Sequence, residues 1–157
     1  MASDQTTLTW GVKQSFRAYV ESAGGVIEVG AGATRAEDGG FSFAAAPGDG
    51  LTLGTDGRPE GTGGFVGEVR FEAHGGMLKV FLADPAVEVG PAGASITVAD
   101  SAARDRRVEF ALLDLAAATR DGDALVIPAK LSRDGWRVLG DHYAPMTALD
   151  PVRLTLG

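Results

Sequence analysis

Cysteine is absent from this sequence of 157 residues, and the other side chains that usually carry catalysis or metal binding are scarce. The absence of cysteine excludes disulfide bonds, thiolate metal sites and cysteine nucleophiles. Only two histidines, His74 and His142, and two tyrosines, Tyr19 and Tyr143, are present. The sequence also contains neither a Gly-x-Ser-x-Gly nor a His-Glu-x-x-His motif, so it gives little support to a hydrolase or a zinc enzyme.

Clusters of positive charge and long apolar runs are missing as well. The formal net charge is −7, and such a surface repels the phosphates of nucleic acids and anionic lipids. The densest basic run contains Arg104, Arg106 and Arg107, which we interpret as a solvated turn rather than a phosphate site. No apolar run approaches the ~20 residues that a membrane-spanning helix needs, and no signal peptide is visible. The sequence therefore predicts neither nucleic acid as a partner nor a transmembrane segment.

Hydrophobic residues are plentiful, and their distribution indicates a β-rich domain. They make up 45% of the chain, enough for the core of a single domain, which we expect to span residues 1–157. The 23 glycines fall between short apolar or alternating runs, a pattern typical of strands joined by turns. We expect a hairpin at Gly75-Gly76 and a long mobile loop at residues 54–64, where glycine and proline dominate. The expected strands are residues 25–30, 40–45, 51–54, 65–74, 77–83, 94–99, 107–115, 124–131 and 152–156.

One segment near the N-terminus has helical rather than strand periodicity. Its apolar residues recur at about 100° per residue and fall on one face, namely Val12, Phe16, Tyr19, Val20 and Ala23. We expect a helix over residues 11–23, with Thr9 as its cap and Gly24-Gly25 at its end. A helix followed by many strands, without βαβ alternation, predicts a mainly β fold, an antiparallel β-sandwich or partly open barrel with an N-terminal α-helix packed on it.

On pattern alone, neither Tyr19 nor His74 has to be functional. Ser15 and Tyr19 are four residues apart and share one helical face at the edge of the apolar stripe. This spacing by itself indicates a half-buried tyrosine whose hydroxyl reaches water. His74 ends a strand on its polar face and precedes Gly75-Gly76, so the pattern indicates a turn residue.

Four segments of the chain match a known family and lie in the family's order. They are Leu8-Thr9-Trp10-Gly11-Val12-Lys13-Gln14-Ser15-Phe16-Arg17-Ala18-Tyr19-Val20, Phe71-Glu72-Ala73-His74-Gly75-Gly76-Met77-Leu78, Asp84-Pro85-Ala86-Val87, and Tyr143 with Leu149-Asp150-Pro151-Val152. HtaA domains open with a Trp-Gly-Val segment followed by Ser-Phe-Arg and then Tyr. Since the ordered set spans nearly the whole chain, the sequence resembles the HtaA-domain family of bacterial haem-uptake proteins.

The resemblance implies a function and a set of site residues. The family takes up haem from host proteins at the surface of Gram-positive bacteria or in their surroundings. By resemblance, Tyr19 is the axial ligand of the iron of haem b, and His74 hydrogen-bonds that tyrosine. Ser15 and Tyr143 help to hold the haem propionates. Apart from the resemblance, the apolar face of the helix leads us to expect that Phe16 and Val20 line an apolar wall of the site. The resemblance also implies an extracellular or cell-surface location, with haem-donor proteins and a downstream haem receptor as partners.

The chemistry of tyrosine agrees with this assignment. Tyrosine is an established protein ligand of haem iron. A free phenol is mostly protonated at neutral pH, but Fe(III) favours the anionic oxygen that binds it. A histidine that shares the phenolic proton sets the strength of the bond. Because an anionic oxygen prefers Fe(III) to Fe(II), such a site captures oxidised haem and weakens on reduction, which suits a carrier.

Two other interpretations remain open besides a haem-transport domain. A cofactor-free β-sandwich that adheres to a cell-surface partner would use the same strands and would not need Tyr19 or His74. A haem enzyme is a third interpretation, because tyrosine ligation also occurs in catalase. It would need a distal acid–base histidine, for which only His142 beside Tyr143 is available. We expect the transport domain, without enzymatic activity.

Overall fold

The computed structural model describes residues 6–36, 39–46, 52–53, 59–90, 93–101, 106–122, 124–138 and 143–155. The strands are β1 (Thr7–Trp10), β2 (Val26–Gly30), β3 (Thr34–Arg35), β4 (Phe41–Ala45), β5 (Thr52–Leu53), β6 (Pro59–Val66), β7 (Glu68–Ala73), β8 (Leu78–Gly90), β9 (Gly93–Ala99), β10 (Arg107–Leu113), β11 (Thr119–Asp121), β12 (Ala124–Leu131) and β13 (Ala148–Thr155). The helices are α1 (Gln14–Ser22) and α2 (Arg133–Val138), with short 3-10 turns at His74–Gly76 and Leu115–Ala117. Within these described ranges, neither helix is long and apolar enough to cross a membrane.

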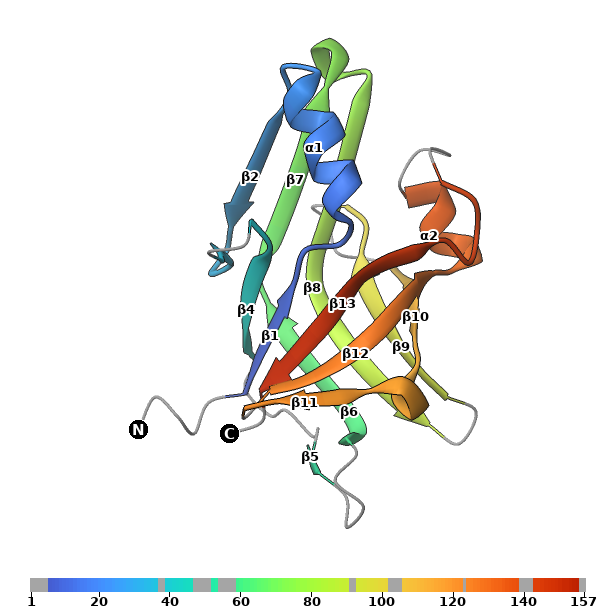
Figure 1. Ribbon diagram of the computed structural model, residues 1–157. Helices are drawn as coiled ribbons and strands as arrows, with labels where there is room; N and C mark the ends of the chain where they lie inside the picture. Colours follow the sequence, from blue (N-terminus) through green and yellow to red (C-terminus); the bar gives the residue numbers. More distant parts are fainter. Residues whose placement is uncertain are drawn as a thin grey trace.

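Eight of the described strands form a closed ring in which every pairing is antiparallel. Around the ring the order is β8, β9, β10, β12, β13, β1, β4 and β6, and β6 pairs back to β8. The first and last strands of the chain are neighbours, with Leu8 opposite Leu154. Figure 1 shows these strands wrapped around a common interior. The fold is therefore mainly β and antiparallel, as the sequence predicts, and it closes as a barrel.

β8 is the longest described strand, and it changes partner along its length. It pairs with β7 from Leu78 to Ala83 and with β6 from Ala86 to Val89. The change occurs at Asp84, whose backbone is left-handed (φ 47°) and whose amide donates to the carbonyl oxygen of Gly67 at 2.8 Å. Such a bulge bends a strand and ends its regular pairing. As a result β7 leaves the ring and, with β2 at its outer edge, forms an extension at one end of the molecule (Figure 1).

α1 contacts this extension through its apolar face. Phe16 and Val20 are fully buried, and the ring of Phe16 meets the edge of Phe71 in β7 at 5.0 Å between centroids. Edge-to-face aromatic pairs of this kind contribute beyond the area that they bury. The helix ends at Ser22, and Gly24, two residues later, has a left-handed backbone (φ 73°) of the kind common just after a helix. Tyr19 lies outside this packed face and keeps 37% of its surface exposed.

The start of α1 differs from the expectation based on the sequence. The helix begins at Gln14 rather than at residue 11. Thr9, expected to cap it, instead lies in β1 and pairs with β4 on one side and β13 on the other. Periodicity missed this strand, because only Leu8 and Trp10 carry its alternation. The tertiary pairing of β1 therefore overrides the local helical pattern at this point.

The long loop expected at residues 54–64 is in part a strand. Residues 54–58 lie outside the described part of the chain, but from Pro59 onward the backbone forms β6. The glycines of β6 pair with β8, and backbone pairing needs no side chain. Glycine is nevertheless rare in strands, which is why the composition indicated a loop. β8 and β13 also extend beyond the expected ranges 77–83 and 152–156.

Candidate functional site

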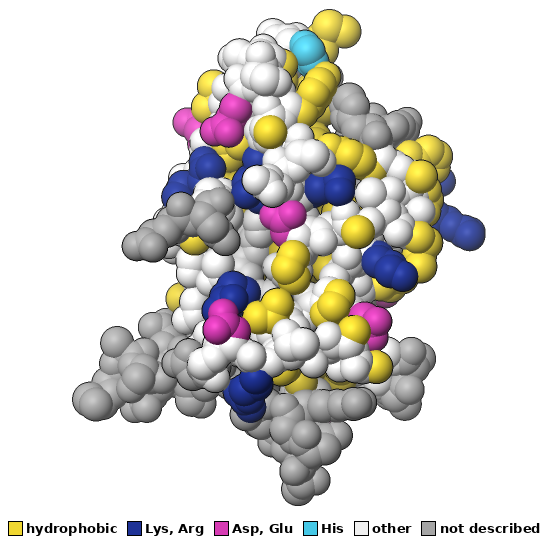
Figure 2. Space-filling view, in the orientation of Figure 1, with side chains coloured by type: hydrophobic (Ala, Val, Ile, Leu, Met, Phe, Trp, Pro, Cys, Tyr) yellow, Lys and Arg dark blue, Asp and Glu magenta, His cyan; other side chains and the backbone are white. Residues whose placement is uncertain are grey.

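Tyr19 and His74, 55 residues apart in sequence, meet at the end of the molecule formed by α1 and the turn between β7 and β8. Tyr19 Oη lies 2.6 Å from His74 Nε2, a hydrogen-bonding distance, and the two rings are 5.7 Å apart at their centroids. Both side chains are exposed. Figure 2 shows hydrophobic side chains beside the histidine at this tip, and Met77, three residues after His74, is 90% exposed. An external ligand therefore has access to the tyrosine oxygen and to apolar surface next to it.

The backbone of the turn gives His74 its position. His74 has a left-handed φ of 56°, and Gly75 and Gly76 follow with φ of 66° and 94°. A left-handed backbone is uncommon for residues other than glycine, although histidine adopts it more often than most. Strain of this kind is often found at functional sites, where it fixes a side chain in one direction. Here it accompanies a sharp turn that brings the imidazole back to the helix that carries Tyr19.

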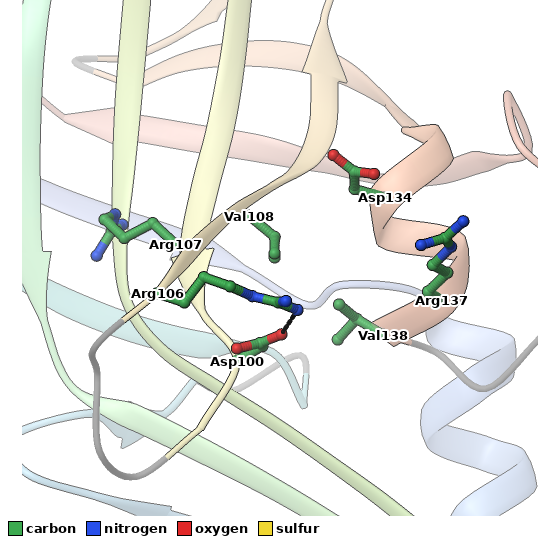
Figure 3. A pocket seen from close by; sticks show the side chains of 7 residues that line it. All are labelled: Asp100, Arg106, Arg107, Val108, Asp134, Arg137 and Val138. Carbon is green, nitrogen blue, oxygen red and sulfur yellow. Dashed lines mark hydrogen bonds and ion pairs between the residues drawn. The ribbon is translucent and has the colours of Figure 1, made fainter.

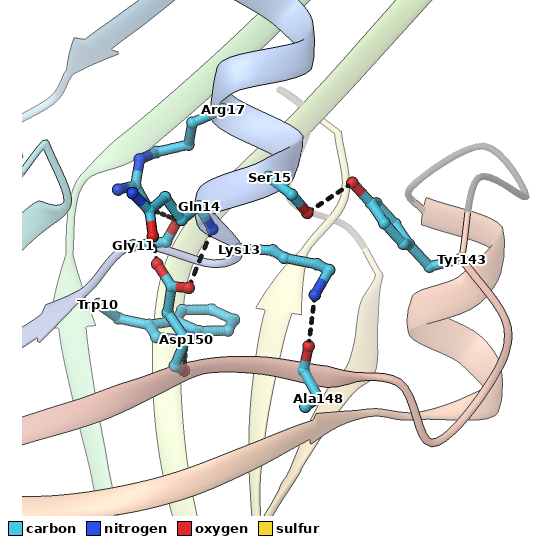
Figure 4. Close-up of polar contacts among 9 residues, drawn as sticks. All are labelled: Trp10, Gly11, Lys13, Gln14, Ser15, Arg17, Tyr143, Ala148 and Asp150. Atoms are coloured by element: carbon cyan, nitrogen blue, oxygen red, sulfur yellow. Dashed lines mark hydrogen bonds and ion pairs between the residues drawn. The ribbon is translucent and has the colours of Figure 1, made fainter.

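A second polar pair lies one helical turn before Tyr19. Ser15 Oγ of α1 is 3.0 Å from Tyr143 Oη, which comes from the segment after α2 (Figure 4). The ring of Phe16 meets the ring of Tyr143 at 6.3 Å in an edge-on arrangement. Phe16 itself is fully buried, so it supports Tyr143 from the core. The structure thus brings together the four residues that the family resemblance singles out, in two pairs joined by α1. The expectation that Phe16 and Val20 line an apolar wall of the site is wrong, because both are fully buried on the face of α1 that packs in the core.

A network of polar contacts, missed by the sequence analysis, ties the start of α1 to β13. Arg17 is 8% exposed, and its guanidinium donates to Asp150 Oδ2 at 2.7 Å and to the carbonyl oxygen of Gly11 at 2.8 Å. Asp150 Oδ1 accepts from the backbone amide of Gln14 at 2.9 Å, which caps the helix from across the sheet (Figure 4). Arg17 and Asp150 lie within the motifs of the family. Nothing in their spacing, however, predicts a pair 133 residues apart.

The backbone of Asp150 strengthens the same junction. Its carbonyl oxygen accepts from Trp10 Nε1 at 2.9 Å, and its amide donates to the carbonyl oxygen of Val12, also at 2.9 Å. Val12 has a left-handed φ of 64°, which is rare for a β-branched residue. A Cβ at Gly11 would collide with the guanidinium of Arg17 and the carboxylate of Asp150. The tight turn from β1 into α1 is therefore stabilised by the close packing of Gly11 against Arg17 and Asp150 and by the backbone contacts of Asp150.

Lys13 is the third residue of the site that the sequence analysis did not single out. Its ammonium group donates to the carbonyl oxygen of Ala148 at 2.7 Å and lies 5.2 Å from the centroid of the Tyr143 ring. Figure 4 shows the lysine side chain reaching between α1 and β13, beside Ser15 and Tyr143. The fold places Lys13 next to the hydroxyl groups of Ser15 and Tyr143. In the sequence, the only indication of this position is that Lys13 precedes Ser15 in the same motif.

A separate hollow of about 380 Å³ lies between β10 and α2 (Figure 3). Arg106 pairs there with Asp100 at 2.9 Å, and Arg107 donates to the carbonyl oxygens of Asp84 and Thr97. Both guanidinium groups are thus bonded within the protein, which argues against a phosphate site, and Arg107 opens β10. Arg104 and His142 lie outside the described part of the chain.

Comparisons with known proteins agree with this architecture. The family model described as Htaa matches residues 5–155. The N-terminal domain of HtaA from Corynebacterium glutamicum is 25% identical, with a TM-score of 0.74 over 98% of this chain and 97% of that chain. The C-terminal domain of the same protein is 22% identical, with a TM-score of 0.74 over 96% of this chain and 94% of that chain. The haem-binding protein HtaB of that organism is 20% identical, with a TM-score of 0.68 over 96% of this chain and 92% of that chain.

A comparison with curated protein sequences finds no match. The assignment therefore depends on the family model and on the solved structures. The model spans the motifs at both ends of the chain, the barrel, the extension and both pairs of site residues. Because it accounts for nearly the whole sequence, the chain belongs to the HtaA family.

Proposed function

We propose that this domain binds ferric haem b and carries it during haem acquisition. The observation that supports the proposal most strongly is the contact of 2.6 Å between Tyr19 Oη and His74 Nε2 at an exposed end of the molecule. A structural relative, HtaB, is by name a haem-binding protein. We assign Tyr19 as the ligand of the iron and His74 as the residue that tunes it.

The residues at this end fit a haem group. Tyr19 extends from a helix whose other face is packed in the core, so its oxygen has a rigid base and remains accessible. Exposed Met77 offers apolar surface that a flat, apolar ligand would remove from water. The donor is also chemically suited, because a phenolate oxygen is an established axial ligand of haem iron.

The hydrogen bond gives His74 a defined task. Haem supplies a Lewis-acidic ferric iron, which binds an anionic oxygen more strongly than a neutral one. His74 Nε2 accepts or shares the phenolic proton and so lets Tyr19 Oη carry more negative charge. The hydrogen-bonding partner of a metal ligand also fixes its orientation and tunes its basicity. His74 therefore acts on the iron through Tyr19 and does not coordinate it.

Ser15 and Tyr143 hold the carboxylate end of the ligand in this proposal. Their hydroxyl groups hydrogen-bond to each other at 3.0 Å and lie one helical turn from Tyr19. Charge-assisted hydrogen bonds from hydroxyl groups to a carboxylate are stronger than bonds between neutral groups. We further propose that residues 1–157 act as one haem-transport domain at the cell surface or outside the cell. Haem-donor proteins and a haem receptor are the partners that this role requires.

A titration of the purified apo-protein with hemin tests the proposal directly. We expect a saturable Soret band with the charge-transfer features of high-spin ferric haem bound to phenolate. The Tyr19→Ala variant, folded as judged by circular dichroism, should show neither. Absence of a saturable band in the wild-type protein would favour the cofactor-free adhesion module instead. An undiminished band in Tyr19→Ala would place the iron ligand elsewhere.

A further inference from the structure

Lys13 stands beside the Ser15–Tyr143 pair and has unused hydrogen-bonding capacity. An ammonium group has three N–H donors. One is donated to the carbonyl oxygen of Ala148 at 2.7 Å, and the group lies 5.2 Å from the centroid of the Tyr143 ring. No carboxylate among the described residues forms an ion pair with Lys13. At least one donor therefore remains available next to the two hydroxyl groups.

The hydroxyl pair likewise has one O–H donor that none of the described residues accepts. Ser15 and Tyr143 have one O–H each, and their mutual hydrogen bond uses only one of the two. The remaining O–H and the ammonium group of Lys13 lie on the same side of α1 (Figure 4). A positive charge with an adjacent O–H donor is a combination that recognises a carboxylate. Neutral polar groups would gain much less from it.

The net negative charge of the protein makes the positive charge of Lys13 more important for binding a ligand that carries carboxylates. The formal net charge is −7, so a ligand with two carboxylates approaches a protein that repels it. Arg17 is close in sequence, but its guanidinium is already paired with Asp150 at 2.7 Å. Lys13 is the cation at this site whose charge is not neutralised by a carboxylate among the described residues.

We infer that Lys13 makes this site selective for porphyrins with free carboxylates. The inference rests on the proposed haem-binding function and extends it. Tyr19 at one end recognises the metal, and Lys13 with Ser15 and Tyr143 at the other end recognises the propionate groups. Esterified or neutral tetrapyrroles lose the second of these interactions.

A comparison of hemin with hemin dimethyl ester tests the inference, because the ester keeps the iron and the ring but lacks the charged carboxylates. We expect the wild-type protein to bind hemin more tightly than the ester. Lys13→Met should reduce hemin affinity by roughly fivefold to tenfold, the range for one partly exposed charge-assisted contact. Its affinity for the ester should equal that of the wild-type protein. Lys13→Arg, which keeps the charge, should restore most of the preference for hemin.

Arg120→Met is the matched control. It removes one positive charge from β11, at the opposite end of the molecule from α1, and so changes the net charge equally (Figure 1). We expect its affinity for both ligands to stay at the wild-type level. An equal loss for both ligands in Lys13→Met would assign the lysine a purely structural role through its bond to Ala148, and would overturn the inference. Unchanged hemin affinity in Lys13→Met would overturn it as well.

A second measurement separates this inference from the proposed function. Iron-free protoporphyrin IX cannot bond to Tyr19 through a metal, so the carboxylate end contributes a larger share of its binding. Quenching of tryptophan fluorescence should show that Lys13→Met, but not Arg120→Met, weakens protoporphyrin binding relative to its dimethyl ester. Failure of the wild-type protein to bind hemin at all would contradict the proposed function. Hemin binding without any discrimination against the ester would contradict only the role of Lys13.

Discussion

At the scale of single residues, the two described tyrosines offer the same functional group in different surroundings. Tyr19 hydrogen-bonds a histidine, whereas Tyr143 hydrogen-bonds a serine. Only the first partner has a ring nitrogen that readily accepts a phenolic proton. We therefore expect Tyr19→Phe, which removes the oxygen alone, to reduce hemin affinity on the order of a hundredfold, or ~3 kcal/mol. Tyr143→Phe should reduce it by no more than about tenfold, the scale of one charge-assisted hydrogen bond.

Hemin titrations of the two variants, followed at the Soret band, check this prediction. The variants are matched, since each loses one hydroxyl group and keeps its aromatic ring. The ring of Tyr143 retains its contact with Phe16 in both proteins. A greater loss in Tyr143→Phe than in Tyr19→Phe would show that the iron ligand has been assigned to the wrong tyrosine.

Substitutions of His74 can separate its effect on the charge of Tyr19 Oη from its effect on the shape of the turn. His74→Asn removes the imidazole but keeps a residue that tolerates the left-handed backbone of the turn (φ 56°). We expect hemin to remain bound with a roughly 10- to 100-fold lower affinity, the usual effect of losing the hydrogen-bonding partner of a metal ligand. The phenolate charge-transfer band should shift, because less negative charge reaches Tyr19 Oη. Absorption spectra and affinities of His74→Asn and His74→Gly provide the measurement.

The comparison between these two variants excludes an effect of the turn alone. His74→Gly accommodates the left-handed φ without strain, so the two substitutions leave different turns but the same missing imidazole. Similar spectra in both would support loss of the imidazole as the cause. A wild-type spectrum and affinity in either variant, or a nitrogen of His74 found bonded to iron, would contradict the tuning role.

At the scale of elements, α1 depends on β13 for its position. Asp150 joins Arg17 and the amide of Gln14 through its carboxylate, while its backbone bonds Trp10 and Val12. Asp150→Asn keeps the backbone contacts and removes the negative charge that lies 2.7 Å from the guanidinium of Arg17, a residue that is 8% exposed. We expect a loss of about 2–3 kcal/mol in the free energy of unfolding, below the 3–5 kcal/mol for fully buried pairs because Asp150 is partly exposed. Urea unfolding of the apo-protein measures this loss.

Asp121→Asn is the control for that prediction. It breaks the ion pair of Asp121 with Arg153, which is 2.9 Å long and also involves β13, but both of its side chains are largely exposed. Exposed pairs contribute little, so we expect a loss of less than about 0.5 kcal/mol. Equal losses in the two variants would show that the Arg17–Asp150 pair does not hold α1 more firmly than an ordinary surface contact.

Helices and strands whose hydrophobic residues repeat regularly could be predicted from the sequence. Strands that form only because they pair with a distant strand could not. The alternation in β7 and the Gly75-Gly76 turn predicted the hairpin that carries His74. β6 escaped notice because its glycines carry no pattern and pair only when β8 lies beside them. The expectation that Thr9 caps the helix is wrong because little in the local sequence marks β1, whose strand neighbours lie far away in the sequence.

The site divides in the same way. The family motifs identified Tyr19, His74, Ser15 and Tyr143, and the geometry groups them into two contacting pairs. The roles of Lys13, Arg17 and Asp150 depend on contacts between the two ends of the chain. Sequence spacing carries no information on such contacts, because the closure of the barrel through β1 and β13 creates them.

At the scale of the whole molecule, ligand binding and folding are coupled through that closure. The helix that carries Tyr19 follows β1 directly, and β13 both closes the barrel and ties down the start of α1. The site therefore exists only when the two terminal strands are paired. A ligand that binds this site binds the folded chain and not the unfolded one, and so it stabilises the fold by mass action.

Thermal unfolding with and without hemin measures this coupling. At a free ligand concentration of about 100 times Kd, binding adds ~2.7 kcal/mol to the free energy of unfolding. For a chain of this length each kcal/mol raises Tm by roughly 2–4 °C, so we expect a rise of roughly 5–10 °C in the wild-type protein. Tyr19→Phe should show at most a small rise at the same concentration, whereas Arg120→Met should show the full effect. An equal rise in the wild-type protein and Tyr19→Phe would mean that hemin binds without the tyrosine oxygen. A fall in Tm would mean that hemin binds the unfolded chain more strongly than the folded one. That result would contradict a binding site that forms only when the barrel is closed.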